Sequence, residues 1–164
     1  ELHGGQISLT SEPGVGSTFY FTLPVPQPRQ RQTGEFTTGY LGPVILAIDD
    51  DAQVIGLYQR YLGNNGYKLF PLTEPSRAVE IASKLQPLAI TLDIMLPESD
   101  GWDVLKLLKS TPATKNIPVI ICTLLEEHDK GLDLGAADYL MKPVLEDDLV
   151  SAIKRLELKK PSSI

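Results

Sequence analysis

From residue 44 onward, short apolar runs alternate with segments in which apolar residues recur every three or four positions. Apolar runs bounded by turns are typical of buried strands, and the longer spacing is typical of amphipathic helices. The pattern predicts strands at 44–48, 67–70, 88–92, 119–122 and 139–141, and helices at 52–62, 74–85, 101–108, 126–134 and 146–156. Strands that are apolar throughout and alternate with helices predict a doubly wound α/β fold, a five-stranded parallel sheet with helices on both faces.

The first 24 residues show a different pattern. Alternating polar and apolar residues at 6–10 and 17–23 predict two strands, and the proline and glycines between them predict a turn. We therefore expect an N-terminal β-hairpin, preceded by a helix end at Gly4-Gly5. A two-stranded hairpin alone is marginally stable in water. Because the aromatic residues 19–21 would otherwise be exposed, pairing with a second copy through strand edges is favoured, which makes a homodimer a candidate.

Residues 25–43 are rich in proline, glycine and polar side chains, which is typical of a linker. The expected organisation is an appendage at 1–24, a linker at 25–43 and an α/β domain at 44–164.

Composition narrows the class of protein. The 164 residues carry a net charge of −6, and the sequence pI is about 4.9, which argues against a nucleic-acid surface. No apolar run approaches the roughly 20 residues of a membrane helix, and no signal peptide opens the sequence. The single Cys122 lies in an apolar run and is expected to be a buried thiol in a reducing compartment. We expect a cytoplasmic protein, with no membrane segment in this stretch.

Polar residues follow the carboxyl ends of four predicted strands. They are Asp49, Asp50 and Asp51 after the first, Asp93 after the third, Thr123 after the fourth, and Lys142 after the fifth. The carboxyl ends of parallel strands meet at one edge of the sheet, where ligands of such folds bind. The sequence therefore predicts that these side chains surround one point.

Three carboxylates at one point repel one another unless one takes up a proton or a cation bridges them. Magnesium fits such a site, because it binds through one or two carboxylates together with phosphate oxygens. Each residue also has an ordinary alternative. An aspartate after a strand is more often a helix cap, and Asp51 is assigned that role. Thr123 could cap the next helix or donate to a phosphoryl oxygen.

Lys142 could be a plain surface lysine, but opposite carboxylates its ammonium can pair with Asp93 or with a phosphate on it. The following Pro143 restricts Lys142 to an extended conformation, and Lys142–Pro143 is a candidate cis peptide bond.

Taken together, these motifs resemble the receiver domain of two-component response regulators over residues 43–159. The similarity rests on the acid pair, on Asp93 followed by Pro97 and Gly101, on Thr123, on Lys142-Pro143, and on the run Gly135-Ala136-Ala137-Asp138-Tyr139. The resemblance implies a flavodoxin-like fold and a phosphorelay function. A histidine kinase or phosphotransfer domain would be the phosphodonor, and the output protein is unknown.

The resemblance also implies a role for each site residue. Asp93 would accept the phosphoryl group from phosphohistidine, and Lys142 would hold the acyl phosphate. Thr123 and Tyr139 would relay its presence, although a tyrosine in a short strand often only packs. Magnesium would be held by Asp49, Asp50, Asp93 and the backbone carbonyl of Met95.

The first five residues, together with residues 11–19, resemble the last glycine box and final strands of a histidine-kinase ATP-binding domain. This likeness covers residues 1–24 and implies the carboxyl-terminal piece of a hybrid histidine kinase. The kinase's asparagine-bearing helix, first glycine box and phosphorylatable-histidine helix are absent, so ATP binding and self-phosphorylation are not expected of this stretch. Its status as an enzyme is left open. His3 would belong to a helix end, and His128 is expected to be solvated.

Three rival functions stay open. A phosphohydrolase with an aspartyl-phosphate intermediate would resemble its family in having an acid two residues after the nucleophile, where this chain has Met95. An interaction module without phosphorylation is disfavoured by the intact acids, Thr123 and Lys142. A DNA-binding regulator would need a further domain.

One departure from the receiver pattern is Leu124, which stands where that family usually has a small residue and is followed by Leu125. We expect this bulk to slow loss of the acyl phosphate.

Overall fold

The computed structural model describes residues 6–12, 16–22, 42–97 and 99–159. The chain divides into two compact units, residues 1–40 and 41–164, and each is described by itself. His3, the predicted helix end at Gly4-Gly5 and most of the linker predicted at 25–43 lie outside the described residues.

The first unit contains two antiparallel strands, β1 (Gln6–Glu12) and β2 (Gly16–Thr22). Their register pairs Gln6 with Thr22 and Glu12 with Gly16. Gly16 has a backbone φ of +133°, which residues other than glycine rarely adopt. Within the described part of the chain, these two strands form a sheet of their own.

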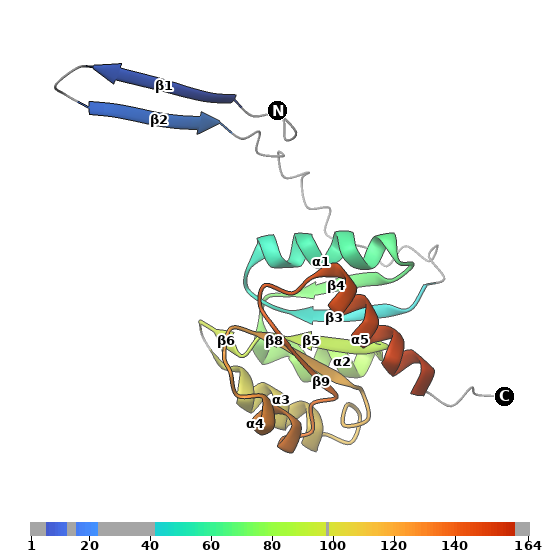
Figure 1. Cartoon of the computed structure of the whole chain (residues 1–164). Coiled ribbons are helices and arrows are strands. Elements are labelled where there is room, and N and C mark those ends of the chain that lie inside the picture. Colours follow the sequence, from blue (N-terminus) through green and yellow to red (C-terminus); the bar gives the residue numbers. More distant parts are fainter. Residues whose placement is uncertain (1–5, 13–15, 23–41, 98, 160–164) are drawn as a thin grey trace. The chain divides into compact units, whose positions relative to one another are not determined.

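The second unit is an α/β fold built on a five-stranded parallel sheet, as the apolar pattern predicted (Figure 1). The described strands of this sheet stand in the order β4-β3-β5-β8-β9. They are β3 (Val44–Ile48), β4 (Lys68–Leu72), β5 (Ala89–Leu92), β8 (Val119–Thr123) and β9 (Asp138–Met141). The helices are α1 (Ala52–Asn64), α2 (Ala78–Leu85), α3 (Gly101–Ser110), α4 (His128–Asp133) and α5 (Glu146–Lys159), with a short 3₁₀ turn, η1 (Pro75–Arg77), before α2. None of the described helices is long and apolar enough to cross a membrane.

The sheet separates two layers of core, because successive strand residues point to opposite faces. Leu46 and Ile48 of β3 pack with α2 and α3 on one face, whereas Ile45 and Ala47 pack with α1 and α5 on the other. Figure 1 shows the same division of helices. All four of these strand residues are fully buried. The sheet is thus covered on both faces, and its carboxyl edge carries the polar residues.

Several boundaries differ from the prediction for physical reasons. Pro75 starts a 3₁₀ turn, so α2 begins at Ala78 rather than at 74. β4 extends through Pro71, which an edge strand tolerates because proline lacks a ladder donor. The segment before His128 is not helical, which leaves α4 only six residues long.

A short hairpin that the sequence did not predict lies inside the α/β unit. It pairs β6 (Met95–Leu96) with β7 (Ser99–Asp100) directly after Asp93. Strands of two residues give too little alternation to be recognised from sequence.

Candidate functional site

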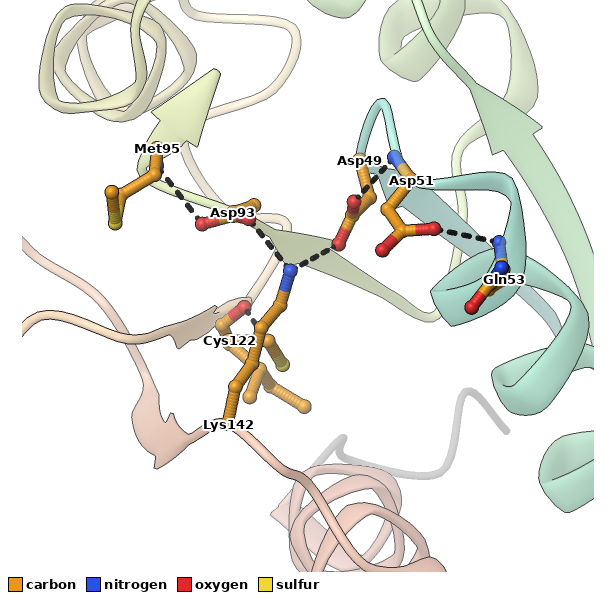
Figure 2. Close-up of polar contacts among 8 residues, drawn as sticks. Asp49, Asp51, Gln53, Asp93, Met95, Cys122 and Lys142 are labelled. Atoms are coloured by element: carbon orange, nitrogen blue, oxygen red, sulfur yellow. Dashed lines mark hydrogen bonds and ion pairs between the residues drawn. The ribbon is translucent and has the colours of Figure 1, made fainter. Parts of the chain in front are cut away.

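Two acidic side chains and one lysine meet at the carboxyl edge of the sheet. Asp49 follows β3, Asp93 follows β5, and Lys142 follows β9. Lys142 Nζ donates to Asp49 Oδ2 at 2.8 Å and to Asp93 Oδ2 at 2.6 Å (Figure 2). The exposed fractions of the three side chains are 4% for Asp49, 8% for Asp93 and 13% for Lys142. The lysine therefore joins the two carboxylates in a largely buried cluster.

Backbone amides fix the other oxygen of each carboxylate. Asp49 Oδ1 accepts from the amide of Asp51 at 2.9 Å, and Asp93 Oδ1 accepts from the amide of Met95 at 2.9 Å. Each carboxylate is thus bound to an amide two residues ahead and presents its second oxygen to Lys142, as Figure 2 shows. The lysine backbone is fixed as well, because its amide donates to the carbonyl of Thr123 at 2.9 Å. The Lys142–Pro143 peptide bond is cis, as the sequence suggested.

Burial and ion pairing have opposite effects on the pKa values of Asp49 and Lys142. Burial raises the pKa of Asp49, and the hydrogen bonds from Lys142 and the Asp51 amide offset this only in part. Burial alone would lower the pKa of Lys142, but the hydrogen bonds to Asp49 and Asp93 outweigh it, so this pKa is raised. The lysine therefore stays an ammonium at neutral pH. With both carboxylates ionised, one ammonium leaves one negative charge unbalanced.

The two neighbouring aspartates lie differently. Asp50 is exposed, whereas Asp51 Oδ1 accepts from the Gln53 amide at 2.8 Å and caps α1, which confirms its predicted role. Across the described ranges, no three acidic, histidine or cysteine side chains gather closely enough to form a metal-binding group. The expected packing of three carboxylates is therefore not what the structure shows. Lys142 stands between Asp49 and Asp93, while Asp50 stays at the surface.

Thr123 and Tyr139 form the other side of the site. Thr123 is fully buried at the end of β8, and its hydroxyl has no hydrogen-bond partner among the described residues. Tyr139 is 7% exposed, and its hydroxyl donates to the carbonyl of Leu125 and accepts from the amide of Glu127 at 3.3 Å. Burial raises the pKa of this phenol. The tyrosine is thus tied to the loop that follows Thr123.

The structure gives Gly101 a part in the site that the sequence had not explained. A Cβ at Gly101 would lie 2.5 Å from Ile94 Cα and 2.7 Å from the carbonyl oxygen of Asp93, so only glycine fits there. Met95 and Leu124 follow β5 and β8, and their exposed fractions are 53% and 62%. The glycine had been noted as part of a motif, but its contact with the backbone of Asp93 depends on the tertiary fold.

Two further predictions can be checked directly. Cys122 is buried as expected, and burial raises the pKa of its thiol to about 12. The side chain of His128 is 57% exposed, but its ring also lies 5.3 Å from the ring of Tyr139, a contact the sequence did not predict.

Comparison with known proteins identifies similar chains. Residues 45–154 match the family described as "Response regulator receiver domain". A curated relative, the response regulator MprA of Mycobacterium leprae, is 36% identical over 115 residues, which are 68% of this chain and 50% of that protein. The chain therefore spans about half the length of this curated relative.

Solved structures show the same similarity. The signal receiver domain of a signal transduction histidine kinase from Syntrophus aciditrophicus is 30% identical, with a TM-score of 0.65 over 75% of this chain and 97% of that chain. The receiver domain of a sensor histidine kinase from Pseudomonas aeruginosa is 25% identical, with a TM-score of 0.64 over 70% of this chain and 97% of that chain. That second structure has a magnesium ion coordinated in its active-site cleft.

Proposed function

Because the chain belongs to the response regulator receiver domain family, whose members act in two-component signalling, we propose that Asp93 is its phosphoryl acceptor. The observation that carries the proposal is the bridge from Lys142 Nζ to Asp93 Oδ2 at 2.6 Å beside the buried Asp49. A lysine at that oxygen can neutralise charge on an attached phosphoryl group.

The reaction transfers a phosphoryl group from phosphohistidine of a histidine kinase or phosphotransfer domain. The N–P bond of the donor breaks, a bond forms between phosphorus and a carboxylate oxygen of Asp93, and the released imidazole takes up a proton from solvent. Lys142 then pairs with the acyl phosphate, and the buried hydroxyl of Thr123 donates to a phosphoryl oxygen. Thr123 suits this role because its hydroxyl has no competing partner in the described part of the chain.

The charge at this edge suits a magnesium ion, which needs only one or two carboxylates together with phosphate oxygens. The buried pair Asp49 and Asp93 carries one negative charge more than Lys142 balances, and the exposed Asp50 stands next to Asp49. We assign the ion to Asp49, Asp50, Asp93 and the backbone carbonyl of Met95. When bound, magnesium neutralises charge on the transferring phosphoryl group. The metal-containing receiver from Pseudomonas aeruginosa supports this assignment.

The switch in this proposal runs from Thr123 to Tyr139. A phosphoryl oxygen that draws the Thr123 hydroxyl toward Asp93 changes the packing next to Tyr139, whose hydroxyl bonds lead to Leu125 and Glu127. The partner that reads this change would bind the face formed by α4, β9 and α5, and would favour one of two states.

The decisive experiment weighs the intact protein after incubation with magnesium and a phosphorylated histidine phosphotransfer domain. The parent should gain one phosphoryl mass, and Asp93→Asn should gain none. Asp51→Asn is the matched control, because Asp51 caps α1 and makes no contact with Lys142. Equal gain by the parent and Asp93→Asn, or no gain by the parent from any of several donors, would contradict the assignment.

We further propose that residues 1–24 are the end of a histidine-kinase ATP-binding domain, that 25–43 are a linker and that 44–164 are the receiver of a hybrid kinase. The support is the glycine-box resemblance, together with the Syntrophus aciditrophicus receiver, which also belongs to a histidine kinase. Determining the coding sequence upstream of Glu1 tests the proposal. An asparagine-bearing helix and a first glycine box are expected there, and an unrelated upstream sequence would overturn it.

A further inference from the structure

Helix α4 depends on its neighbours for its position. Of its six residues, all of them described, Gly131 is the one that is buried. No side chain of the described residues caps the helix at Glu127. Helices this short are not stable by themselves in water, because the entropy lost in forming the first turn exceeds the free energy that its few hydrogen bonds contribute. The contacts around α4 therefore decide where it lies.

On one side, α4 packs against Tyr139. A Cβ at Gly131 would lie 2.7 Å from Ile121 Cδ1 and 2.9 Å from Tyr139 Cδ2, so the helix backbone touches the tyrosine ring directly. The ring of His128 is 5.3 Å from the same tyrosine ring. These contacts belong to the switch already described.

On the other side, α4 contacts α3 through one charged side chain. Lys130 Nζ lies 4.3 Å from the centroid of the Trp102 ring. The indole is only 5% exposed, so packing fixes its position. Trp102 is the second residue of α3 and directly follows Gly101, which contacts the carbonyl oxygen of Asp93. A cation over a tryptophan face is a favourable electrostatic contact.

We propose that Lys130 and Trp102 form a latch that holds α4 against α3, so that α4 is released only when this contact and the Tyr139 contacts both break. The latch provides a second physical connection between the backbone of Asp93 and α4, through Gly101 and Trp102 rather than through Thr123. It acts in the unphosphorylated chain, and so its test is independent of the proposed phosphotransfer.

A competing contact has to be separated from the latch. Lys130 Nζ also lies 2.6 Å from Glu127 Oε2, an ion pair in which both side chains are nearly half exposed. Exposed pairs of this kind contribute little to stability. Glu127→Gln therefore removes the ion pair and leaves the latch, whereas Lys130→Gln removes both.

Hydrogen exchange of the α4 amides measures how often the helix opens. The reporters are the amides of Gly131 and Leu134, which donate to the carbonyls of Glu127 and Lys130. Lys130→Gln should speed their exchange by about two- to fivefold, the factor that corresponds to a partly exposed cation–π contact. Lys130→Arg should restore slow exchange, because a guanidinium also stacks on an indole. Lys106→Gln is the matched control, since Lys106 on α3 pairs with Asp103.

The fluorescence emission of the folded protein gives a second measurement, which a general loss of stability does not change. Trp102 is the only tryptophan in the sequence, so its emission reports the latch directly. Lys130→Gln should shift the emission of the folded protein, and Glu127→Gln should leave it unchanged. Unchanged exchange and emission in Lys130→Gln would overturn the latch, as would a Glu127→Gln variant that reproduces the full effect.

Discussion

The two sides of the site differ in how completely their polar atoms are paired. In the acid–lysine cluster, four contacts of 2.6–2.9 Å connect Asp49, Asp93 and Lys142 to one another and to backbone amides. In contrast, the buried hydroxyl of Thr123 has no partner within the described residues. The first side is fully paired in the unphosphorylated chain, and in the proposed function a phosphoryl group supplies the partner that Thr123 lacks. We therefore expect changes on the first side to alter the stability of the fold most, and changes on the second side to alter the response to phosphorylation most.

The largest effect is expected from breaking the paired side with Lys142→Met. The change leaves two buried carboxylates without their cation, which typically costs about 3–5 kcal/mol. Urea unfolding at pH 7 measures the loss, and transfer to Asp93 should slow by at least about 100-fold. A loss below about 1 kcal/mol would show that the cluster contributes little to stability.

The pH dependence of the same variant sharpens this result. The raised pKa of Lys142 means that its contribution is complete below the usual 10.5 and is lost as the pH rises through the folded value. The raised pKa of Asp49 means that its ionisation destabilises the fold as the pH rises above the usual 3.8, and more so without Lys142. The stability difference between parent and variant should therefore grow from acid to neutral pH and shrink again above pH 10.5.

The next effect concerns Leu124, which we expect to shield an acyl phosphate on Asp93 from water. Leu124→Ala removes apolar bulk from a side chain that is 62% exposed directly after Thr123. Water should then reach the acyl phosphate more easily, and its lifetime should shorten several-fold. Intact mass measured at intervals after removal of the donor gives the lifetime. Leu158→Ala is the control, because Leu158 is 87% exposed at the end of α5. If the parent itself loses the phosphoryl group within seconds at neutral pH, the retarding role of Leu124 is wrong.

A smaller effect is expected from Tyr139→Phe. The variant keeps the ring and removes the hydroxyl that joins Leu125 and Glu127, which should lower the free energy of unfolding by about 0.5–1.5 kcal/mol. The Glu127 amide should then exchange faster than this loss of stability alone explains, with β3 and β5 as the measure of the global change. An unchanged Glu127 amide would show that this hydroxyl does not hold the loop.

The smallest effect on stability is expected at the unpaired side itself. Thr123→Val replaces a hydroxyl that lacks a partner with a methyl group of similar shape, so the unphosphorylated protein should be as stable as the parent or slightly more so. In the proposed switch, the effect of phosphorylation on hydrogen exchange at the Glu127 amide, which donates to Tyr139, should nevertheless disappear, whereas Thr123→Ser should retain it. A clear loss of stability in unphosphorylated Thr123→Val would mean that the hydroxyl already has a partner.

The sequence predicted the parts of this molecule that depend on local pattern. Apolar runs such as 44–48 predicted the strands, and their alternation with helices predicted the parallel sheet, whose strand order comes from the structure. Because the carboxyl ends of parallel strands share one edge, Asp49, Asp93 and Lys142 could be expected to meet. The shortness of α4, the hairpin after Asp93 and the contact of Lys130 with Trp102 could not be predicted, since each depends on tertiary packing rather than on periodicity.

The sequence left open how the acids are neutralised. Three adjacent carboxylates suggested a proton or a metal ion between them, and Lys142 was expected to pair with Asp93. In the structure Lys142 pairs with both Asp49 and Asp93, while Asp50 is exposed. The residue types predicted attraction between acids and a cation, but only the fold decides which oxygens a flexible lysine reaches.

The position of Lys142 along the chain has a consequence for synthesis. It follows Asp49 by 93 residues and Asp93 by 49 residues. A chain made from its amino end therefore exposes both acids long before their cation exists. Until β9 has been made and has paired with β8, Asp49 and Asp93 therefore lack the ammonium of Lys142. The site is thus completed by the last strand of the sheet, well after the strands that carry its acids have been made.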